Sequence, residues 1–571
     1  MSRHRHREKR EKSSGQNSSD EEQENNSRHR KRDREHRHKK HRRSKGSGKM
    51  SVWKGVLLWF LALLQIAQDW ILEFFLGLYW GEKKVCPGPT SSNKELVQKS
   101  AVELAKLIRE RKVKCYDVVK AFTDRINETN GFLNAVVDGP FPEALEEAQE
   151  IDLMLAKGVF TNKDFEEKPF LGVPFTTKES TSVKDKKLSL GLVSRKNEIG
   201  REDAECVRKA KEAGAIIIGL TNVPEVNKWI ESRNNVYGQT NNPYDNRRTV
   251  GGSSGGEACI ISSCGTGFGI GTDIGGSIRI PAFSCGIFGH KPTENSVSMK
   301  GCTFRTAKEE PTMVAAGPMS RHAEDLLPLL NVLVSNDKKA ALKLDETVDL
   351  KKLRYFYITE NGIVAATPVN SETKNVMKKV TRYFQELTEQ DVVKSKLPGL
   401  EKSKNMWRYW MTKEPANFNK LMGNGDEVNP IVELLKKLVG QSDFSMAGVF
   451  GLIDGILPAE NEKMVLELTK KLEDALNELL GDDGILFFTS NPRTAAFHYY
   501  PLFFKFNDFH FFSIFNVLKV PVTQVPMGLD SNGLPLGIQV VATRNRDRHC
   551  IAVARELERA FGGWVPPFQQ T

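Results

Sequence analysis

The sequence predicts an α/β fold built around a central β-sheet. Short apolar runs typical of buried strands recur along the chain and alternate with amphipathic helical segments. The chain has 571 residues, of which 39% are hydrophobic, so it can build a large core. No internal repeat and no second boundary follow Pro87. We therefore expect a single large domain over residues 96–571.

Residues 1–50 form a basic tail that we expect to be disordered. The tail holds a net charge of +10 out of the chain's +11 and almost no apolar residues. The rest of the chain is nearly neutral, so its composition gives no sign of nucleic-acid binding. We favour a solvated tail over a contact with nucleic acid or anionic lipid. A chain started at Met50 would lack the tail.

Residues 51–81 predict a membrane anchor helix. The segment 55–64 is uncharged and mostly apolar. Four polar residues then follow on one helical stripe: Gln65, Gln68, Asp69 and Glu73. An acidic side chain in a bilayer needs a partner. The helix therefore either spans the membrane with this stripe packed on protein, or lies in the interface as a monotopic anchor. We expect an internal membrane, such as the endoplasmic reticulum or a lipid droplet, and leave the topology open.

Residues 82–95 predict a linker, because Pro and Ser are frequent there. Ser100 and Glu103 have the spacing of a capping box that opens a helix. A second helix is expected from about Asp117. Buried strands are predicted in residues 170–180, 213–222 and 483–492, and a hairpin in residues 520–542 that turns at Asn532-Gly533.

Two later segments allow more than one interpretation. Residues 429–457 begin with an amphipathic turn, and residues 497–515 contain ten aromatic side chains. Both patterns are common in ordinary cores. Either segment could instead contact lipid, and the aromatic run could line a pocket for a long apolar ligand.

The stretch 250–293 combines many glycines with many hydroxyls, which suits a phosphate site or a nucleophile site. It contains no Walker loop and no GxGxxG pattern, so phosphate binding loses its specific support. The sequence GGSSGG matches a nucleophile elbow at Ser254, but that match is weak in so glycine-rich a segment. Ser277 is more informative, because Gly275 and Gly276 precede it and could turn backbone N–H groups towards a bound carbonyl.

A nucleophilic serine needs a base, and no histidine has a distinctive setting. A lysine can be neutral near pH 7 when it is desolvated among apolar groups. Lys178 ends the predicted strand FLGVPFTTK and has such surroundings. On its own, Lys178 would be read as a surface lysine after a strand.

Three motifs together resemble the amidase signature family: GVPFTTKE, GGSSGGE and GTDIGGSIRIPAFSCGIFGHKPT. The similarity runs from about Leu96 to the C-terminus and includes TNVPE, GQTNNPYD and GLPLGIQVVA. Within the family, the chain resembles the fatty acid amide hydrolase branch in its type 2 form. The resemblance implies the amidase-signature fold for residues 96–571, with a central twisted mixed β-sheet covered by helices on both faces.

The resemblance also implies a Ser–cis-Ser–Lys triad. Ser277 would be the nucleophile, Lys178 the base, and Ser253, in a cis peptide, the bridge between them. The oxyanion would be held by the backbone N–H groups of Ile274, Gly275, Gly276 and Ser277. Asp273 and Arg279 match the motif as scaffold positions without a chemical step.

The sequence thus favours a membrane-bound serine amidase that hydrolyses fatty acid amides to a fatty acid and an amine or ammonia through an acyl-enzyme. One alternative is an amidase for short-chain or aryl amides or esters. Another is a membrane-tethered binding protein that uses the basic tail. The expected partners are a lipid amide substrate and the bilayer, with no nucleic acid. Pairing of membrane helices would allow a homodimer. No metal or organic cofactor is called for.

Overall fold

The computed structural model describes residues 59–569, with gaps at residues 304, 307–311 and 504. The predicted tail and the first residues of the predicted anchor helix lie outside the described residues. The chain divides into two units, residues 1–65 and residues 66–571. The predicted sheet and the candidate site residues all belong to the second unit.

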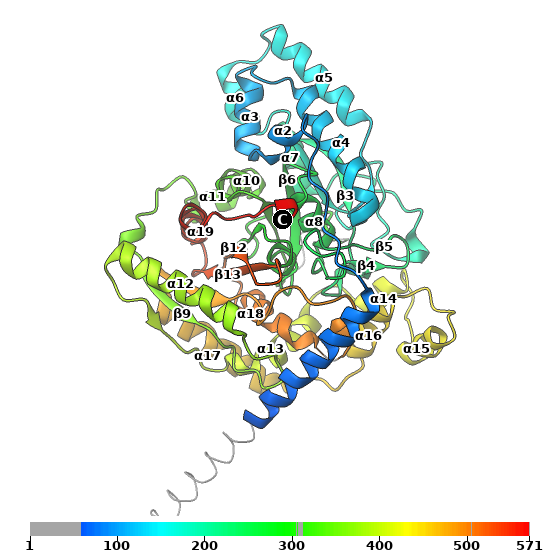
Figure 1. Cartoon of the computed structure of the whole chain (residues 1–571), viewed down its shortest axis with the longest axis vertical. Helices are drawn as coiled ribbons and strands as arrows, with labels where there is room; N and C mark the ends of the chain where they lie inside the picture. Colours follow the sequence, from blue (N-terminus) through cyan, green and yellow to red (C-terminus); the bar gives the residue numbers. More distant parts are fainter. Residues whose placement is uncertain (1–58, 304, 307–311, 504, 570–571) are drawn as a thin grey trace, which may run out of the picture. The chain divides into compact units, whose positions relative to one another are not determined.

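A single large sheet organises the second unit (Figure 1). Within the described residues it has eleven strands in the order β1-β3-β2-β6-β8-β7-β12-β13-β11-β9-β10. Strands β2, β3 and β6 are parallel, as are β9, β10 and β11, whereas the strands between these groups pair antiparallel. The strands are β1 (Val136–Asp138), β2 (Pro174–Lys178), β3 (Ile216–Thr221), β6 (Phe268–Asp273), β7 (Phe288–Lys291), β8 (Ala315–Ser320), β9 (Arg354–Ile358), β10 (Val393–Lys394), β11 (Gly484–Thr489), β12 (Val522–Leu529) and β13 (Pro535–Val541).

Helices cover both faces of the sheet. As a result, every position is buried in β2, β3, β6, β11 and β13. The mixed sheet and its helical cover confirm the predicted fold class. The principal helices are α3 (Ala101–Arg109), α4 (Cys115–Leu133), α5 (Glu143–Ala156), α8 (Gly255–Ser262), α9 (Arg279–Ser284), α10 (Leu326–Leu333), α12 (Ser371–Thr388), α13 (Ser403–Lys413), α15 (Pro430–Leu438), α16 (Met446–Asp454), α17 (Glu462–Leu480), α18 (His510–Val517) and α19 (Asp547–Phe561).

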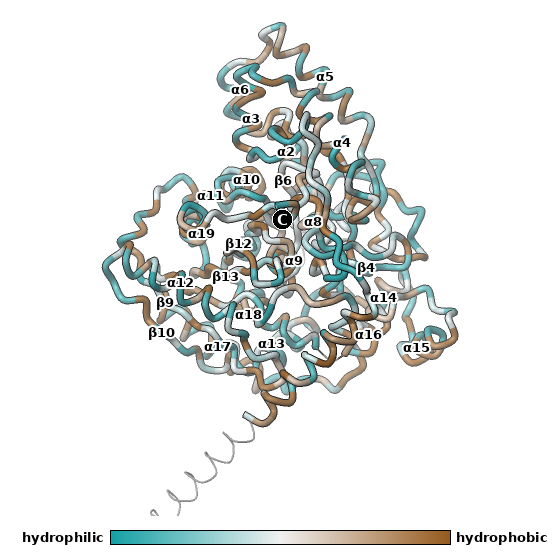
Figure 2. Tube along the Cα trace, in the orientation of Figure 1, coloured by the Kyte–Doolittle hydropathy of each residue, from teal (hydrophilic) through white to brown (hydrophobic). Residues whose placement is uncertain are grey.

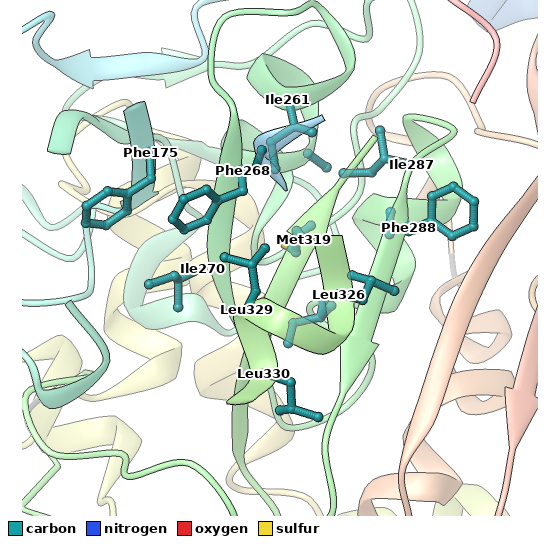
Figure 3. Packing of buried hydrophobic residues seen from close by; sticks show 14 of the residues in the cluster. Phe175, Ile261, Phe268, Ile270, Ile287, Phe288, Met319, Leu326, Leu329 and Leu330 are labelled. Carbon is teal, nitrogen blue, oxygen red and sulfur yellow. The ribbon is translucent and has the colours of Figure 1, made fainter. Parts of the chain in front are cut away.

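The core is closely packed where β2 and β6 meet (Figure 3). Phe175 of β2 stacks on Phe268 of β6, with ring centroids 5.3 Å apart. Leu326, Leu329 and Leu330 place one face of α10 in the same cluster. A fully buried side chain of this size stabilises the fold by roughly 1.5–3 kcal/mol. This packing keeps the end of β2 fixed relative to β6.

The local predictions agree with these elements. The three predicted strand runs contain β2, β3 and β11, and the predicted hairpin is β12–β13. Ser100 caps α3 by accepting a hydrogen bond from the N–H of Glu103. The Glu103 carboxylate pairs with Lys99, 2.7 Å away, and not with the N–H of Ser100, so the predicted capping box is only half formed. All eight cysteines are buried and unbridged.

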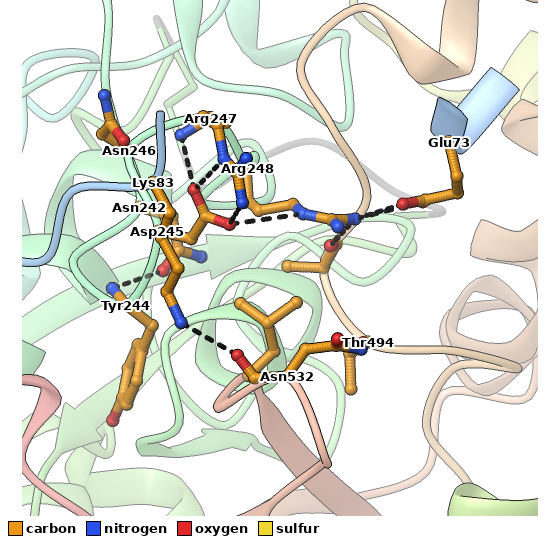
Figure 4. Close-up of polar contacts among 12 residues, drawn as sticks. Glu73, Lys83, Asn242, Tyr244, Asp245, Asn246, Arg247, Arg248, Thr494 and Asn532 are labelled. Carbon is orange, nitrogen blue, oxygen red and sulfur yellow. Dashed lines mark hydrogen bonds and ion pairs between the residues drawn. The ribbon is translucent and has the colours of Figure 1, made fainter. Parts of the chain in front are cut away.

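Two acidic residues of the predicted polar stripe, Asp69 and Glu73, form ion pairs with other residues of the second unit. The helix Trp59–Trp80 is long and apolar enough to cross a membrane by length and composition. Asp69 nevertheless lies 2.6 Å from Nζ of Lys505 and accepts a hydrogen bond from Tyr500. Glu73 pairs with Arg248 at 2.9 Å (Figure 4). The acidic side chains on this stripe thus find basic partners in protein.

The opposite face of the same helix is apolar and exposed. Its exposed large side chains within the second unit are Ile66, Trp70, Ile71, Phe74, Phe75, Leu78 and Tyr79. Figure 2 shows apolar residues on this helix and on α15 and α16. In α15, Ile431, Leu435 and Leu438 are exposed while Glu433 is buried. The apolar stripe of α15 therefore does not face the core.

Candidate active site

Lys178 is the last residue of β2 and is fully buried. Its Nζ lies 2.9 Å from Oγ of Ser253 and 2.8 Å from Oγ1 of Thr272. Thr272 belongs to β6, so the parallel pairing of β2 with β6 brings this hydroxyl to the lysine. A neutral amine can accept one hydrogen bond and donate two. Lys178 can therefore take a proton from Ser253 while Thr272 holds its position.

The electrostatic setting of Lys178 favours the neutral amine. Burial lowers the pKa of Lys178 to about 7 from an ordinary value of 10.5, against the opposing attraction of Asp273 and Glu257. Burial also raises the pKa of Glu257 to about 7. Glu257 accepts hydrogen bonds from Thr176 and, at 2.7 Å, from Thr221. A pKa near 7 makes the neutral amine accessible at neutral pH, which is the form that a general base needs.

The two serines come from segments that lie against each other. The Gly252–Ser253 peptide bond is cis, as the resemblance implied. The N–H of Ser254 donates to the carbonyl of Ser277 at 3.1 Å. A Cβ at Gly252 would lie 2.5 Å from the carbonyl oxygen of Trp229, so only glycine fits there. Both Ser253 and Ser277 line the same cavity, and Ser277 is the more exposed of the two.

Asp273 organises the loop between β6 and Ser277. Burial acts to raise its pKa, but the Arg279 guanidinium, 3.1 Å away, lowers it to about 2. The Asp273 carboxylate accepts hydrogen bonds from the N–H groups of Gly276 and Ile278, at 2.7 and 3.0 Å. Gly276 has a φ of +116°, a conformation that favours glycine. Asp273 and Arg279 thus form the scaffold that the motif implied.

The backbone N–H groups predicted to hold the oxyanion do not all point the same way. The N–H of Gly276 is directed at Asp273. The carbonyl of Ile274 accepts a hydrogen bond from the indole of Trp407 at 3.0 Å. Because a peptide unit is planar and trans, this bond directs the N–H of Gly275 to the opposite side. Ile274, Gly275 and Ser277 line the cavity, and they remain the candidate donors.

The cavity in front of Ser277 has a volume of about 430 Å³. Most of its lining is apolar and includes Ile280, Met411, Phe450, Ile453, Leu502 and Phe509. Two of the three roles considered for the aromatic run are present, since Phe509 lines the cavity while Phe511 and Phe515 lie in the core. His510 also lines the cavity, but its Nδ1 lies 2.9 Å from Oγ of Ser513, and burial lowers its pKa to about 3.

Comparisons with known proteins show the family of this chain. The family model described as Amidase matches residues 117–551. Fatty-acid amide hydrolase 2 of Homo sapiens is 40% identical over 529 residues, covering 89% of this chain and 99% of that protein. Fatty-acid amide hydrolase 2-A of Danio rerio is 38% identical, covering 90% of this chain and 98% of its own. This chain belongs to the amidase family.

The amidase fold extends over most of the chain. A solved structure named fatty acid amide hydrolase superposes with a TM-score of 0.68 at 21% identity, covering 84% of this chain and 87% of its own. The predicted resemblance, including its type 2 form, is confirmed. This amidase is an amide-hydrolysing enzyme.

Sequence reasoning missed two residues that hold the site of this amidase together. Thr272 contacts Lys178, and Trp407 contacts the Ile274 carbonyl. Thr272 stands directly before Asp273 in the motif, so its place at the end of a buried strand was a usable signal. Trp407 lies in α13, far along the chain from the loop that it contacts, and no local pattern marks it.

Proposed function

We propose that this amidase is a membrane-bound serine hydrolase of long-chain fatty acid amides, with Lys178, Ser253 and Ser277 as its triad. The observation that carries the proposal is the hydrogen bond between Ser253 and the buried Lys178, whose pKa is lowered to about 7. Ser253 and Ser277 line the same apolar cavity. The names of the curated relatives support the same substrate class.

The proposed mechanism moves one proton along the triad. Neutral Lys178 takes a proton from the Ser253 hydroxyl, and Ser253 takes one from Ser277 as its Oγ attacks the amide carbonyl carbon. Backbone N–H groups stabilise the oxyanion that forms. The proton returns through Ser253 to the nitrogen as the C–N bond breaks, and the amine leaves. Water then attacks the acyl-enzyme by the same proton route and releases the fatty acid.

The shape and lining of the cavity favour a long apolar acyl chain. A volume of about 430 Å³ exceeds what a short acyl group fills. Burial of each CH₂ group in such a site is worth about 0.8 kcal/mol. A long chain should therefore bind more tightly than a short one, by a factor that grows with each methylene.

The substrate assignment is tested by comparing a twelve-carbon and a two-carbon primary amide with the full-length, detergent-solubilised enzyme. We expect kcat/KM for the long amide to be at least about 100-fold higher. Equal rates, or hydrolysis of the short amide alone, would keep the amidase and contradict the fatty-acyl assignment. The second outcome would favour the short-chain or aryl amide alternative.

We further propose that the exposed apolar face of residues 66–80 contacts lipid. The acidic side chains of this helix bind Lys505 and Arg248, so the remaining face is the one available to a membrane. The exposed apolar residues of α15, and Ile456 and Leu457 just after α16, suit the same role. Helix α16 itself contributes Phe450 and Ile453 to the cavity. A membrane-bound substrate would thus meet an element that lines the cavity.

The double substitution Phe74→Ser and Phe75→Ser should weaken binding to neutral phosphatidylcholine vesicles by at least about tenfold. Both side chains are more than half exposed, so folding should be unaffected. Co-sedimentation of the full-length protein measures the binding, and neutral vesicles keep the contribution of the basic tail small. Leu153→Ser on α5, where the leucine is also exposed, is the matched control and should change nothing. Unchanged binding of the double variant would contradict the proposed lipid contact.

A further inference from the structure

A lysine lies in the lining of the otherwise mainly apolar cavity. Lys228 lines the cavity that contains Ser277 and also a second cavity of about 630 Å³. The two cavities share part of their walls, including Trp229 and Trp407. The second cavity is more polar, with Glu225 and Lys413 among its lining residues. Lys228 therefore stands where an apolar chamber adjoins a polar one.

The backbone before Lys228 is held in an unfavourable conformation. Val226 and Asn227 have φ values of +46° and +61°. Such a φ is a genuine outlier for a β-branched residue, and it persists only where the surrounding structure enforces it. Here the Asn227 amide donates to Ser180 at 2.9 Å and to Thr303 at 2.8 Å. These contacts fix the segment that presents Lys228 to the cavity.

The ammonium of Lys228 has spare hydrogen-bonding capacity. It donates to the carbonyl of Gly451 in α16 at 2.8 Å and lies 5.3 Å from the ring centre of Phe418. Among the residues that the structure describes, no carboxylate oxygen lies within 4.0 Å of its Nζ. An ammonium has three donors, so two stay available for a ligand.

The other charged groups around the cavity have partners in the protein. Arg305 pairs with Glu414 at 2.7 Å, and Arg408 pairs with Glu460 and, at 3.5 Å, with Asp454. Burial lowers the pKa of Lys228, and the negative charge of Asp454 acts in the opposite direction. A partly buried cation without an anionic partner is costly. A ligand carboxylate would supply that partner.

We propose that Lys228 binds the carboxylate of the substrate, so that this enzyme prefers fatty amides whose nitrogen carries an amino acid. This inference rests on the proposed function and specifies the amine part of its substrate. The acyl chain would fill the apolar chamber beside Phe450 and Phe509. The amine part would then lie towards the polar cavity, where Lys228 stands. An ion pair in a partly desolvated site strengthens binding of the anionic substrate over a neutral one of equal length.

The test compares kcat/KM for N-lauroylglycine and N-lauroylethanolamine, which differ mainly in charge. The full-length solubilised enzyme should prefer the glycine amide. Lys228→Met should lower kcat/KM for N-lauroylglycine by about 10- to 100-fold and change that for N-lauroylethanolamine by less than about threefold. Lys228→Arg, which keeps the charge, should retain most of the preference. Lys163→Met, at an exposed lysine of α6 (Asn162–Glu167), controls for net charge.

Each other outcome has a distinct meaning. An equal loss for both substrates would overturn the proposal and leave Lys228 as a support for α16 through Gly451. No preference for the glycine amide in the unmodified enzyme would overturn it as well. A primary amide with a carboxylate at the far end of its acyl chain is the third substrate. If Lys228→Met affects only that amide, the carboxylate lies at the acyl end and the amine-side assignment is wrong. If the unmodified enzyme hydrolyses no fatty amide, the proposed function itself fails.

Discussion

Replacing Ser277 by alanine should lower kcat for a long-chain amide by at least about 10⁴-fold, to the background rate. The substitution removes the only oxygen that the proposed mechanism uses to form the acyl-enzyme, and nucleophile deletions in serine hydrolases have effects of this size or larger. Ser277 lines the cavity, and the loss of one hydroxyl there should leave the thermal midpoint within about 2 °C. Initial rates and a thermal unfolding curve measure both quantities.

The neighbouring serine gives the matched control. Ser254 is the centre of the weak nucleophile-elbow match, and its Oγ lies 3.4 Å from the carbonyl of Thr272. It directly precedes α8 and does not line the cavity that contains Ser277. Ser254→Ala should therefore cost less than about tenfold in kcat. If Ser254→Ala lost most of its kcat while Ser277→Ala kept it, Ser254 and not Ser277 would be the nucleophile.

Replacing Lys178 by methionine should lower kcat/KM by about 10²- to 10⁴-fold, the usual contribution of a general base. Methionine fills a similar volume without a proton acceptor. Because burial of the lysine amine carries a desolvation cost, the variant should be as stable as the unmodified enzyme or more so. Lys178→Arg should not restore activity, since a guanidinium stays protonated. Recovery of activity in the arginine variant would rule out a neutral base at this position.

The same lysine predicts a pH profile. The protonated form, present below a pKa of about 7, cannot accept a proton, whereas the neutral form above that value can. The rate should therefore rise about tenfold per pH unit below pH 7 and level off above it. This limb should disappear from the residual activity of Lys178→Met. A profile of the unmodified enzyme that is flat from pH 5 to pH 9 would contradict the assignment of the base.

Short-range patterns in the sequence predict much of this fold. The apolar runs around β2, β3 and β11 are long enough to mark buried strands, and Asn532-Gly533 marks the hairpin turn. The glycine and serine motifs likewise mark the loops that carry Ser253 and Ser277. These features depend only on residues that are close in the sequence, so local patterns are enough to predict them.

Contacts between distant segments account for what could not be predicted. Trp407 reaches the Ile274 carbonyl across 133 positions of the chain, and Lys228 reaches Gly451 across 223. The acidic stripe of the anchor helix was visible in the sequence, but its partners Lys505 and Arg248 were not. Such pairings depend on how the elements pack, which no single segment reveals.

The central claim is most directly tested by mapping the residue that a long-chain alkyl fluorophosphonate modifies, using peptide mass spectrometry on the full-length enzyme. Such a reagent forms a stable phosphonyl ester with an activated serine. We predict a single adduct on Ser277, with labelling strongly slowed in Lys178→Met. An adduct on another residue, or hydrolysis of fatty amides by an enzyme that the reagent leaves unmodified, would contradict the proposed triad.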